Sequence, residues 1–279
     1  MTFLRQLIEL QHRAWSVALR SALLPVGSLF RRNDRHLTWR LWEASSGANR
    51  PGVYPEVTLG AVLSVDSTVT LQVLPNQTYN VTELELLAIS AIVSQRQARV
   101  TLEFGTADGR TTLNIALNAA PGGTVFTLNL PLQQAAITSA DVKDGTLWHD
   151  SAGHKQDVPV GFHFLGRETP ASIVQLWGNS QSFDFAPYLG KCEIVFVDGD
   201  HFEPGVSIDC DTALTLVDRS DGVVLWHDAL RYDVQTALPR LARRDGLPVH
   251  LIAGTNLAAL FFLDGHSVEP AIWQGRRRG

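Results

Sequence analysis

The sequence predicts an α/β protein built on a doubly wound, mostly parallel sheet of seven strands. From Ala98 onward, short apolar segments alternate with amphipathic segments of helical period, the pattern of parallel strands joined by crossover helices. Polar residues and glycines follow the ends of these apolar segments, and ligands bind at that edge of such sheets. With 279 residues, 45% of them hydrophobic, the chain is long enough to bury one large domain.

The first 80 residues predict an N-terminal addition to this sheet. Apolar residues recur at helical spacing from Phe3 to Phe30, and the basic residues Arg31, Arg32 and Arg35 follow. We expect this helix to pack on the domain or on a second subunit; the alternative is a helix lying at a membrane surface. Alternating β-branched residues between Asn49 and Pro75 predict short strands of a small β appendage.

Residues 81–279 form the predicted main domain. A helix from about Thr82 to Gln95 begins with the capping-box pattern Thr82-x-x-Glu85. Seven strands are predicted at Arg99–Phe104, Thr124–Leu128, Ser172–Leu176, Glu193–Val197, Val223–Trp226, Val249–Ile252 and Leu257–Leu263. Further helices are predicted at Thr111–Asn118, Pro204–Leu216 and Val234–Arg243. The polar segment 131–170 lacks periodicity and is predicted to be an insertion, either a lid or a disordered segment.

Composition and charge exclude several classes of function. A formal net charge of -5 gives no positive field that would attract nucleic acid. The two cysteines, Cys192 and Cys210, lack the spacing of a zinc site or a disulfide framework, so we expect buried thiols in a reducing compartment. No apolar run approaches the roughly 20 residues of a membrane span, and no cleavable leader pattern is found. We therefore expect a soluble, cytoplasmic protein.

The first predicted strand leads into a glycine-containing turn. Its sequence is Glu103-Phe104-Gly105-Thr106-Ala107-Asp108-Gly109-Arg110-Thr111. Glycine allows positive φ and a close approach of the backbone to a ligand, and the acid can accept hydrogen bonds from an ammonium or hydroxyl group. The turn lacks the GxGxxG pattern, and no GK[ST] phosphate loop occurs. These absences argue against a nucleotide di- or triphosphate.

The following strands also end in polar residues. The second leads into Asn129, the third into Gly178-Asn179-Ser180-Gln181, the fourth into Asp198-Gly199-Asp200-His201 and the fifth into His227-Asp228. Acids after two neighbouring strands, with no Lys or Arg beside them, predict a bound cation, and Mg²⁺ prefers oxygen ligands. His201 could act as a general base near neutral pH. The alternative is that Asp198 and Asp200 only shape a turn or cap the next helix.

Together these motifs resemble the class I S-adenosylmethionine-dependent methyltransferases, whose sheet is Rossmann-like. Glu103 to Gly109 resembles the family's first motif, E-x-G-x-x-x-G, and Asp198 to His201 resembles the D-G-x-H motif of metal-dependent enzymes that methylate sugar and macrolide hydroxyls. Leu225-Trp226-His227-Asp228 resembles the fifth-strand motif, and Gly254-Thr255-Asn256 leads into the antiparallel last strand. The resemblance covers about two thirds of the chain, in the order and spacing of its motifs.

The resemblance implies a role for each matching residue. The turn that holds the methionine moiety of S-adenosylmethionine corresponds to Glu103, Gly105, Ala107, Gly109 and Thr111. The ribose position corresponds to Asn129, and the adenine position to Asn179 and Ser180. Mg²⁺ or a similar divalent ion would be bound by Asp198, which also borders the cofactor, and by Asp228. The catalytic base corresponds to His201.

Two residues depart from the family pattern. Asn129 stands where most members have an acid that accepts both ribose hydroxyls, and an amide has only one acceptor oxygen. Ala229 follows Asp228, where catechol-type members have an asparagine ligand.

The function expected is Mg-assisted methyl transfer to a hydroxyl of a small molecule, such as a sugar, a glycan or a polyketide-like metabolite. The alternative is a non-catalytic binding or assembly protein that kept the fold, which Asn129 and the N-terminal addition favour.

A third class, a metal-dependent oxygenase or hydrolase, is also considered, because a fold does not fix a function. It needs a site of two histidines and one carboxylate, which the sequence alone does not place. We expect the histidines of the insertion, His149, His154 and His163, to be solvated. The expected partners are a small-molecule acceptor and, given the tryptophans of the N-terminal addition, a second copy of the chain; nucleic acid is not expected.

Overall fold

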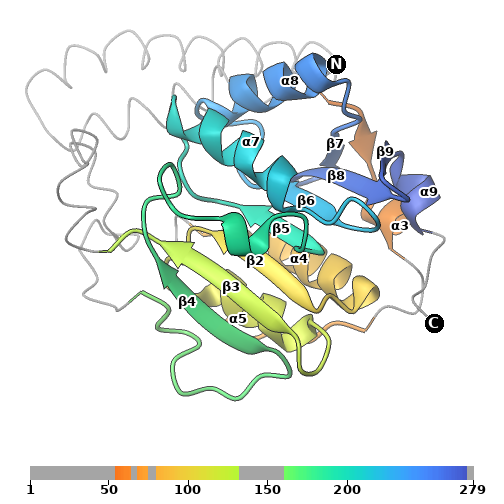
Figure 1. The fold of residues 1–279 in the computed structure, drawn as a ribbon. Coiled ribbons are helices and arrows are strands. Elements are labelled where there is room, and N and C mark those ends of the chain that lie inside the picture. Colours follow the sequence, from red (N-terminus) through yellow and green to blue (C-terminus); the bar gives the residue numbers. More distant parts are fainter. Residues whose placement is uncertain (1–53, 64–67, 75–79, 132–159, 275–279) are drawn as a thin grey trace, which may run out of the picture. The chain divides into compact units, whose positions relative to one another are not determined.

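One sheet organises the computed structural model, which describes residues 54–63, 68–74, 80–131 and 160–274, all within the unit Gly52–Gly279 (Figure 1). Its strands lie in the order β1-β7-β8-β6-β5-β2-β3-β4, and β9 pairs with β8. Their bounds are β1 Glu56–Val57, β2 Val100–Phe104, β3 Thr124–Asn129, β4 Ser172–Trp177, β5 Ile194–Val197, β6 Val223–Trp226, β7 His250–Ile252, β8 Ala258–Leu263 and β9 His266–Val268.

The strand directions confirm the doubly wound, mostly parallel sheet. Strands β4, β3, β2, β5 and β6 are parallel, and β8 runs antiparallel between β6 and β7. All seven predicted strands are present, and β1 and β9 bring the sheet to nine within the described residues. Because the chain order reverses between β2 and β5, the segments that follow these neighbouring strands leave toward opposite faces and a crevice is expected there.

Helices cover both faces of the sheet (Figure 1). Helices α7 (Gly205–Leu216) and α8 (Val234–Asp245) contribute to one hydrophobic cluster with side chains of β2, β5, β6 and β8. Helices α3 (Leu59–Val62), α4 (Glu83–Arg96), α5 (Arg110–Asn118) and α9 (Pro270–Gln274) contribute to the cluster on the other face. The central strands β5, β6 and β8 are buried along their whole length, as expected for a sheet with helices on both faces.

Helix α4 begins as the sequence predicts. The Thr82 side chain accepts a hydrogen bond from the backbone N–H of Glu85, and the Glu85 side chain accepts one from the backbone N–H of Thr82. This capping box satisfies two backbone donors that a helix start leaves unpaired. The helix ends at Arg96, and its C-cap residue Gln97 adopts a left-handed conformation. Glu85, although charged, is buried, so this helix start lies inside the protein.

Three predictions require correction or extension. Between Asn49 and Pro75, where short strands of a β appendage are predicted, the described residues include Glu56–Val57, which pairs with β7 in the main sheet, and Leu59–Val62, which is helical. The short elements β9 and α9 were not predicted, because each is too brief to show a period. The N-terminal helix and most of the insertion lie outside the described residues, and the division of the chain at residue 80 stays a prediction.

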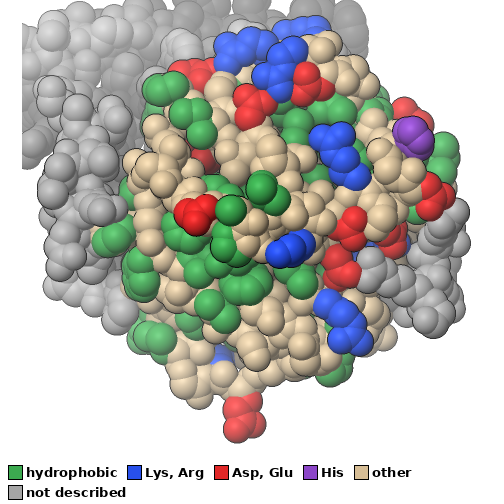
Figure 2. Space-filling model, viewed as in Figure 1, with side chains coloured by type: hydrophobic (Ala, Val, Ile, Leu, Met, Phe, Trp, Pro, Cys, Tyr) green, Lys and Arg blue, Asp and Glu red, His purple; other side chains and the backbone are tan. Residues whose placement is uncertain are grey.

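The surface over α7 and α8 carries charges of both signs. Figure 2 shows Lys or Arg beside Asp or Glu there, and exposed ion pairs join Arg240 to Glu203 and Arg244 to Asp211 and Asp245. None of the helices in the described part of the chain is long and apolar enough to cross a membrane.

Candidate active site at the ends of strands β2, β5 and β6

The glycine turn after β2 lies directly against the end of β5. Gly105 has a φ of +88°, and a Cβ at this position would lie 2.1 Å from the backbone oxygen of Asp198. The Asp198 N–H in turn donates to the Phe104 oxygen at 3.0 Å. Only glycine fits between these two segments, so the contact aligns the turn with the predicted metal-binding acid.

The rest of the turn leads into α5 through left-handed residues. Ala107 has a φ of 57°, and Gly109, at a φ of 81°, is the N-cap of α5. The Ala107 N–H donates to Asn129 Oδ1 at 3.3 Å, so the turn is attached to the end of β3. Thr111 is buried in the first turn of α5. The five residues predicted from the first motif therefore line one continuous segment from β2 to α5.

Glu103 is fully buried on β2. Its Oε2 accepts hydrogen bonds from the hydroxyls of Thr127, at 2.6 Å, and Thr112, whereas Oε1 is buried without a hydrogen bond. Burial, with smaller contributions from the charges of Asp198 and Asp108, raises the pKa of Glu103 to about 8, although the threonine hydrogen bonds act in the opposite direction. An uncompensated acceptor in this position can receive a donor from a ligand.

The predicted ribose and adenine residues occupy the ends of β3 and β4. Asn129 uses its carbonyl oxygen to accept from Ala107, and its amide donates to the Leu130 oxygen at 2.9 Å. Asn179 Oδ1 accepts from the Gln181 N–H at 2.9 Å. The only acceptor atom of the Asn129 amide is therefore already engaged within the protein.

Asp209, on α7, connects two of these loops and was not predicted. Its Oδ2 accepts from the Asp200 N–H at 3.1 Å, and its side chain also hydrogen-bonds to Ser180. Burial raises the pKa of Asp209 to about 6, and the charge of Asp200 acts in the same direction, against the hydrogen bonds from Ser180 and Asp200. Asp209 thereby links the loop after β4 to the loop after β5.

Two histidines and two aspartates converge where β5 and β6 end. His201 Nε2 lies 3.4 Å from Asp198 Oδ1 and 3.4 Å from Asp228 Oδ2. His227 Nδ1 lies 3.1 Å from Asp198 Oδ1 and 3.7 Å from Asp228 Oδ2. Asp228 is left-handed, with a φ of 50°, and its Oδ1 is buried without a hydrogen bond. The structure thus brings the predicted residues Asp198, His201 and Asp228 together and adds His227.

Electrostatic coupling shifts the protonation of this cluster. Burial alone would raise the pKa of Asp198, but the charge of His227 and the hydrogen bond from His201 outweigh it and leave the pKa well below its usual range. Burial lowers the pKa of each histidine, yet Asp198 and Asp228 raise both above the ordinary value, that of His227 by the larger amount. Without a bound cation, the histidines neutralise the acids.

Glu85 completes the cluster from the opposite helix layer. Its Oε2 lies 3.3 Å from His227 Nε2, and its Oε1 accepts from the Asn256 N–H at 2.7 Å. Burial raises the pKa of Glu85, but the hydrogen bond and charge of His227 and the backbone donors of Asn256 and Thr82 lower it to about 2. Sequence reasoning identified Glu85 only as a capping residue, because nothing local indicates a contact with β6.

The structure adds two contacts of histidines that the sequence does not place. Asp198, His201 and His227 offer ligand atoms that all lie within 4.8 Å of one another, so a cluster of two histidines and one carboxylate exists among the described residues. The signal in the sequence was His227 itself, directly before Asp228. His163 is not simply solvated: its Nε2 lies 3.5 Å from Asp108 Oδ2, and its backbone N–H donates to the Asp108 oxygen. His149 and His154 lie outside the described residues.

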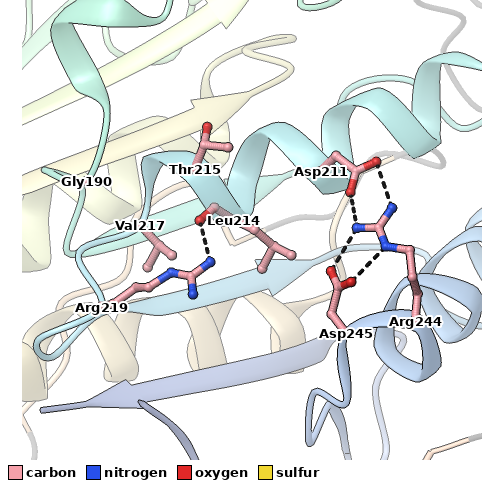
Figure 3. A pocket seen from close by; sticks show the side chains of 8 residues that line it. All are labelled: Gly190, Asp211, Leu214, Thr215, Val217, Arg219, Arg244 and Asp245. Atoms are coloured by element: carbon pink, nitrogen blue, oxygen red, sulfur yellow. Dashed lines mark hydrogen bonds and ion pairs between the residues drawn. The ribbon is translucent and has the colours of Figure 1, made fainter. Parts of the chain in front are cut away.

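A separate open pocket lies near the opposite ends of the strands (Figure 3). It is lined by Gly190, Asp211, Leu214, Thr215, Val217, Arg219, Arg244 and Asp245. Figure 3 shows the Arg244 guanidinium held between Asp211 and Asp245, and Arg219 donates to the Leu214 oxygen at 3.5 Å. The charge of Arg244 is therefore balanced within the protein by two acids.

The comparison with protein families agrees with the motifs. Residues 102–229 match a family model described as a methyltransferase domain, and the comparison with curated proteins finds no match. Among solved structures, the chain is similar to an O-methyltransferase from Bacillus cereus in complex with SAH, at 18% identity over 70% of this chain and 84% of that chain, with a TM-score of 0.41.

Two further solved structures show a comparable likeness. The O-methyltransferase TomG from Streptomyces achromogenes, involved in tomaymycin synthesis and solved in complex with SAM, is 20% identical over 67% of this chain and 82% of that chain, with a TM-score of 0.42. A precorrin-6y C5,15-methyltransferase from Geobacter metallireducens is 12% identical over 74% of this chain and 96% of that chain, also with a TM-score of 0.42.

Proposed function

We propose that this chain transfers the methyl group of S-adenosylmethionine to a hydroxyl of a small molecule with the help of a divalent cation. The match of residues 102–229 to a methyltransferase domain supports the proposal. The observation that carries the proposal is the convergence of Asp198, His201 and Asp228 beside the glycine turn after β2. Because these groups lie at the reversal point of the sheet, an acceptor held there would face a cofactor bound along the turn.

The turn residues are suited to hold the cofactor. Gly105 and Gly109 keep the backbone free of side chains, and the unpaired buried Oε1 of Glu103 offers an acceptor for an ammonium group. Asn179 and Ser180, at the end of β4, are proposed to border the adenine. When bound, S-adenosylmethionine supplies an electrophilic methyl group for in-line displacement.

Asp198 and Asp228 fit a divalent cation. Asp228 Oδ1 is buried and accepts no hydrogen bond, and Arg231 Nη1 lies 3.8 Å from it. Ala229, by contrast, is fully buried in the hydrophobic core and offers no ligand. A divalent ion held by the two aspartates would lower the pKa of an acceptor hydroxyl.

His201 is proposed as the general base. It is 27% exposed, so its ring can reach an acceptor, and Asp198 and Asp228 stabilise the imidazolium that forms when it takes a proton. The Tyr232 ring contacts His201 at 5.2 Å between centroids, and Phe202 contacts Tyr232 at 5.7 Å. These rings pack edge to face and offer aromatic surface beside the base, which supports an acceptor with a sugar or other ring.

A non-catalytic protein with the same fold is the second candidate. The observation that favours it is the engaged carbonyl of Asn129, which leaves the cofactor ribose without the usual carboxylate acceptor. Calorimetric titration with S-adenosylmethionine and S-adenosylhomocysteine, with and without Mg²⁺, separates the two. Micromolar binding supports the enzyme and justifies a screen of hydroxylated acceptors. No binding under either condition, together with a stable protein partner in pull-down experiments, supports the non-catalytic function.

A further inference from the structure

We propose that His227 is a metal ligand through Nδ1, and that the site at Asp198 therefore selects a first-row transition ion of the Co²⁺ or Zn²⁺ type over Mg²⁺. The inference deepens the proposed function and rests on it for the presence of a cation at Asp198. It goes beyond the pair of aspartates, because it adds a nitrogen ligand that changes which ion is bound.

The spacing of the ligand atoms fits a transition ion. His227 Nδ1 lies 3.1 Å from Asp198 Oδ1 and 3.7 Å from Asp228 Oδ2. Ligand atoms that each lie about 2.1 Å from one ion are separated from their neighbours by roughly 3 to 3.5 Å. The separation of His227 Nδ1 and Asp198 Oδ1 thus falls within this range, and that of His227 Nδ1 and Asp228 Oδ2 lies slightly above it. Imidazole nitrogen suits Zn²⁺, Co²⁺ and Ni²⁺, whereas Mg²⁺ keeps to oxygen ligands and water.

The other side of the His227 ring carries the partner that metal-bound histidines have. Nε2 lies 3.3 Å from Glu85 Oε2, and a histidine ligand usually donates its second N–H to such a carboxylate. This contact selects the tautomer whose Nδ1 lone pair faces Asp198. Glu85 is itself fixed by the backbone donors of Thr82, at 2.7 Å, and Asn256, at 2.7 Å, so the orientation is built into the fold.

His227 is favoured over His201 as the ligand. The His227 side chain is 9% exposed against 27% for His201, and only His227 contacts the buried Glu85 carboxylate. His201 also packs its ring against Tyr232, toward the side where an acceptor is proposed to bind. This assignment leaves His201 available for the proton and gives the two histidines different, separable roles.

The test is a titration of the metal-free, full-length protein with Co²⁺, followed by visible ligand-field absorption, with Mg²⁺ as competitor and without cofactor or acceptor. We expect one Co²⁺ to bind at least about tenfold more tightly than Mg²⁺. His227→Ala should lose at least about tenfold in Co²⁺ affinity and change the spectrum, and Glu85→Gln should lose affinity by a similar factor. His227→Glu should shift the preference toward Mg²⁺, because it makes the ligand set all oxygen.

Two controls make the result specific. His250→Ala removes another buried histidine that contacts a carboxylate, Glu269, away from this site, and should leave Co²⁺ binding unchanged. Circular dichroism and thermal unfolding establish that each variant is folded. Wild-type protein that binds no Co²⁺, or a folded His227→Ala or His227→Glu variant with unchanged affinity and spectrum, overturns the inference. Calorimetry with S-adenosylmethionine tests the proposed function separately, since neither His227 nor Glu85 belongs to the glycine turn after β2.

Discussion

His227 Nε2 lies 3.3 Å from Glu85 Oε2, although the two residues are 142 positions apart in the sequence. His227 directly follows β6, and Glu85 lies in the first turn of α4. The contact joins the capping box of α4 to the acids after β5 and β6. Five predictions follow from this arrangement and its neighbours.

Replacing Glu85 should destabilise the fold more than its position at a helix start suggests. Glu85→Ala removes the acceptor of the Thr82 and Asn256 N–H groups and leaves His227 Nε2 without its partner, which we expect to cost about 2 to 4 kcal/mol. Urea unfolding measures the loss. The exposed neighbour Glu83 provides the control, with a change of about 0.5 kcal/mol or less for Glu83→Ala. Equal losses in the two variants would contradict the buried role of Glu85.

Replacing His201 should affect turnover rather than folding. We expect His201→Ala to lower kcat by a factor of about 10² to 10⁴, with little change in cofactor affinity, because a general base acts in the transition state. Transfer of a labelled methyl group to an acceptor found by screening gives the rate, and calorimetry gives the affinity. Asp198→Ala should lower both. Full activity in both variants would exclude the proposed mechanism.

Gly105 should tolerate no side chain. Both Gly105 and Gly122 are left-handed, but a Cβ at Gly105 would meet the Asp198 oxygen at 2.1 Å, whereas one at Gly122 would meet nothing within 4 Å. Gly122→Ala should therefore cost only the backbone strain, about 1 to 2 kcal/mol, and Gly105→Ala clearly more, with loss of cofactor binding. Unfolding curves for the matched pair measure the difference. Similar free energies of unfolding for the two variants would show that the glycine turn and the end of β5 can move apart without a loss of stability.

Glu103 should make folding stability depend on pH. Its pKa is raised from 4.5 to about 8, so the folded protein holds this proton more tightly than the unfolded chain. Its contribution is complete below about pH 4.5 and is lost as the pH rises through 8, a change on the order of 5 kcal/mol at 1.36 kcal/mol per pH unit. Glu103→Gln lacks this titration. Denaturant unfolding between pH 5 and pH 8 should show the wild-type stability falling relative to the variant; parallel curves would refute the raised pKa.

Restoring an acid at position 129 should strengthen cofactor binding. Asn129→Asp keeps an acceptor for the Ala107 N–H and adds a second, charged oxygen for the ribose hydroxyls. We expect S-adenosylmethionine to bind about tenfold more tightly, equivalent to about 1.4 kcal/mol. Calorimetry of both proteins is the measurement, and adenine alone is the control ligand, because it lacks the ribose. An unchanged affinity would mean that the ribose does not meet this residue.

Local patterns in the sequence predict most of the secondary structure of the described domain. The alternation of apolar segments predicts the seven strands within one or two residues, and the Thr82 and Glu85 pair predicts the start of α4. The prediction of strands fails at Leu59–Val62, which is helical. Packing of α3 against α9 and the core, which the sequence does not show, overrides the local preference there.

The sequence by itself determined the motifs that follow each strand, and with them Asp198, His201 and Asp228, because the ends of parallel strands share one edge of the sheet. Only the tertiary structure decided their protonation and their partners. Glu85 reaches His227 across the sheet, Asp209 reaches Asp200 from α7, and the carbonyl of Asn129 is taken by Ala107. These contacts depend on the order and register of the strands and on which helix covers which face of the sheet. The spacing of residues along the chain does not indicate these features.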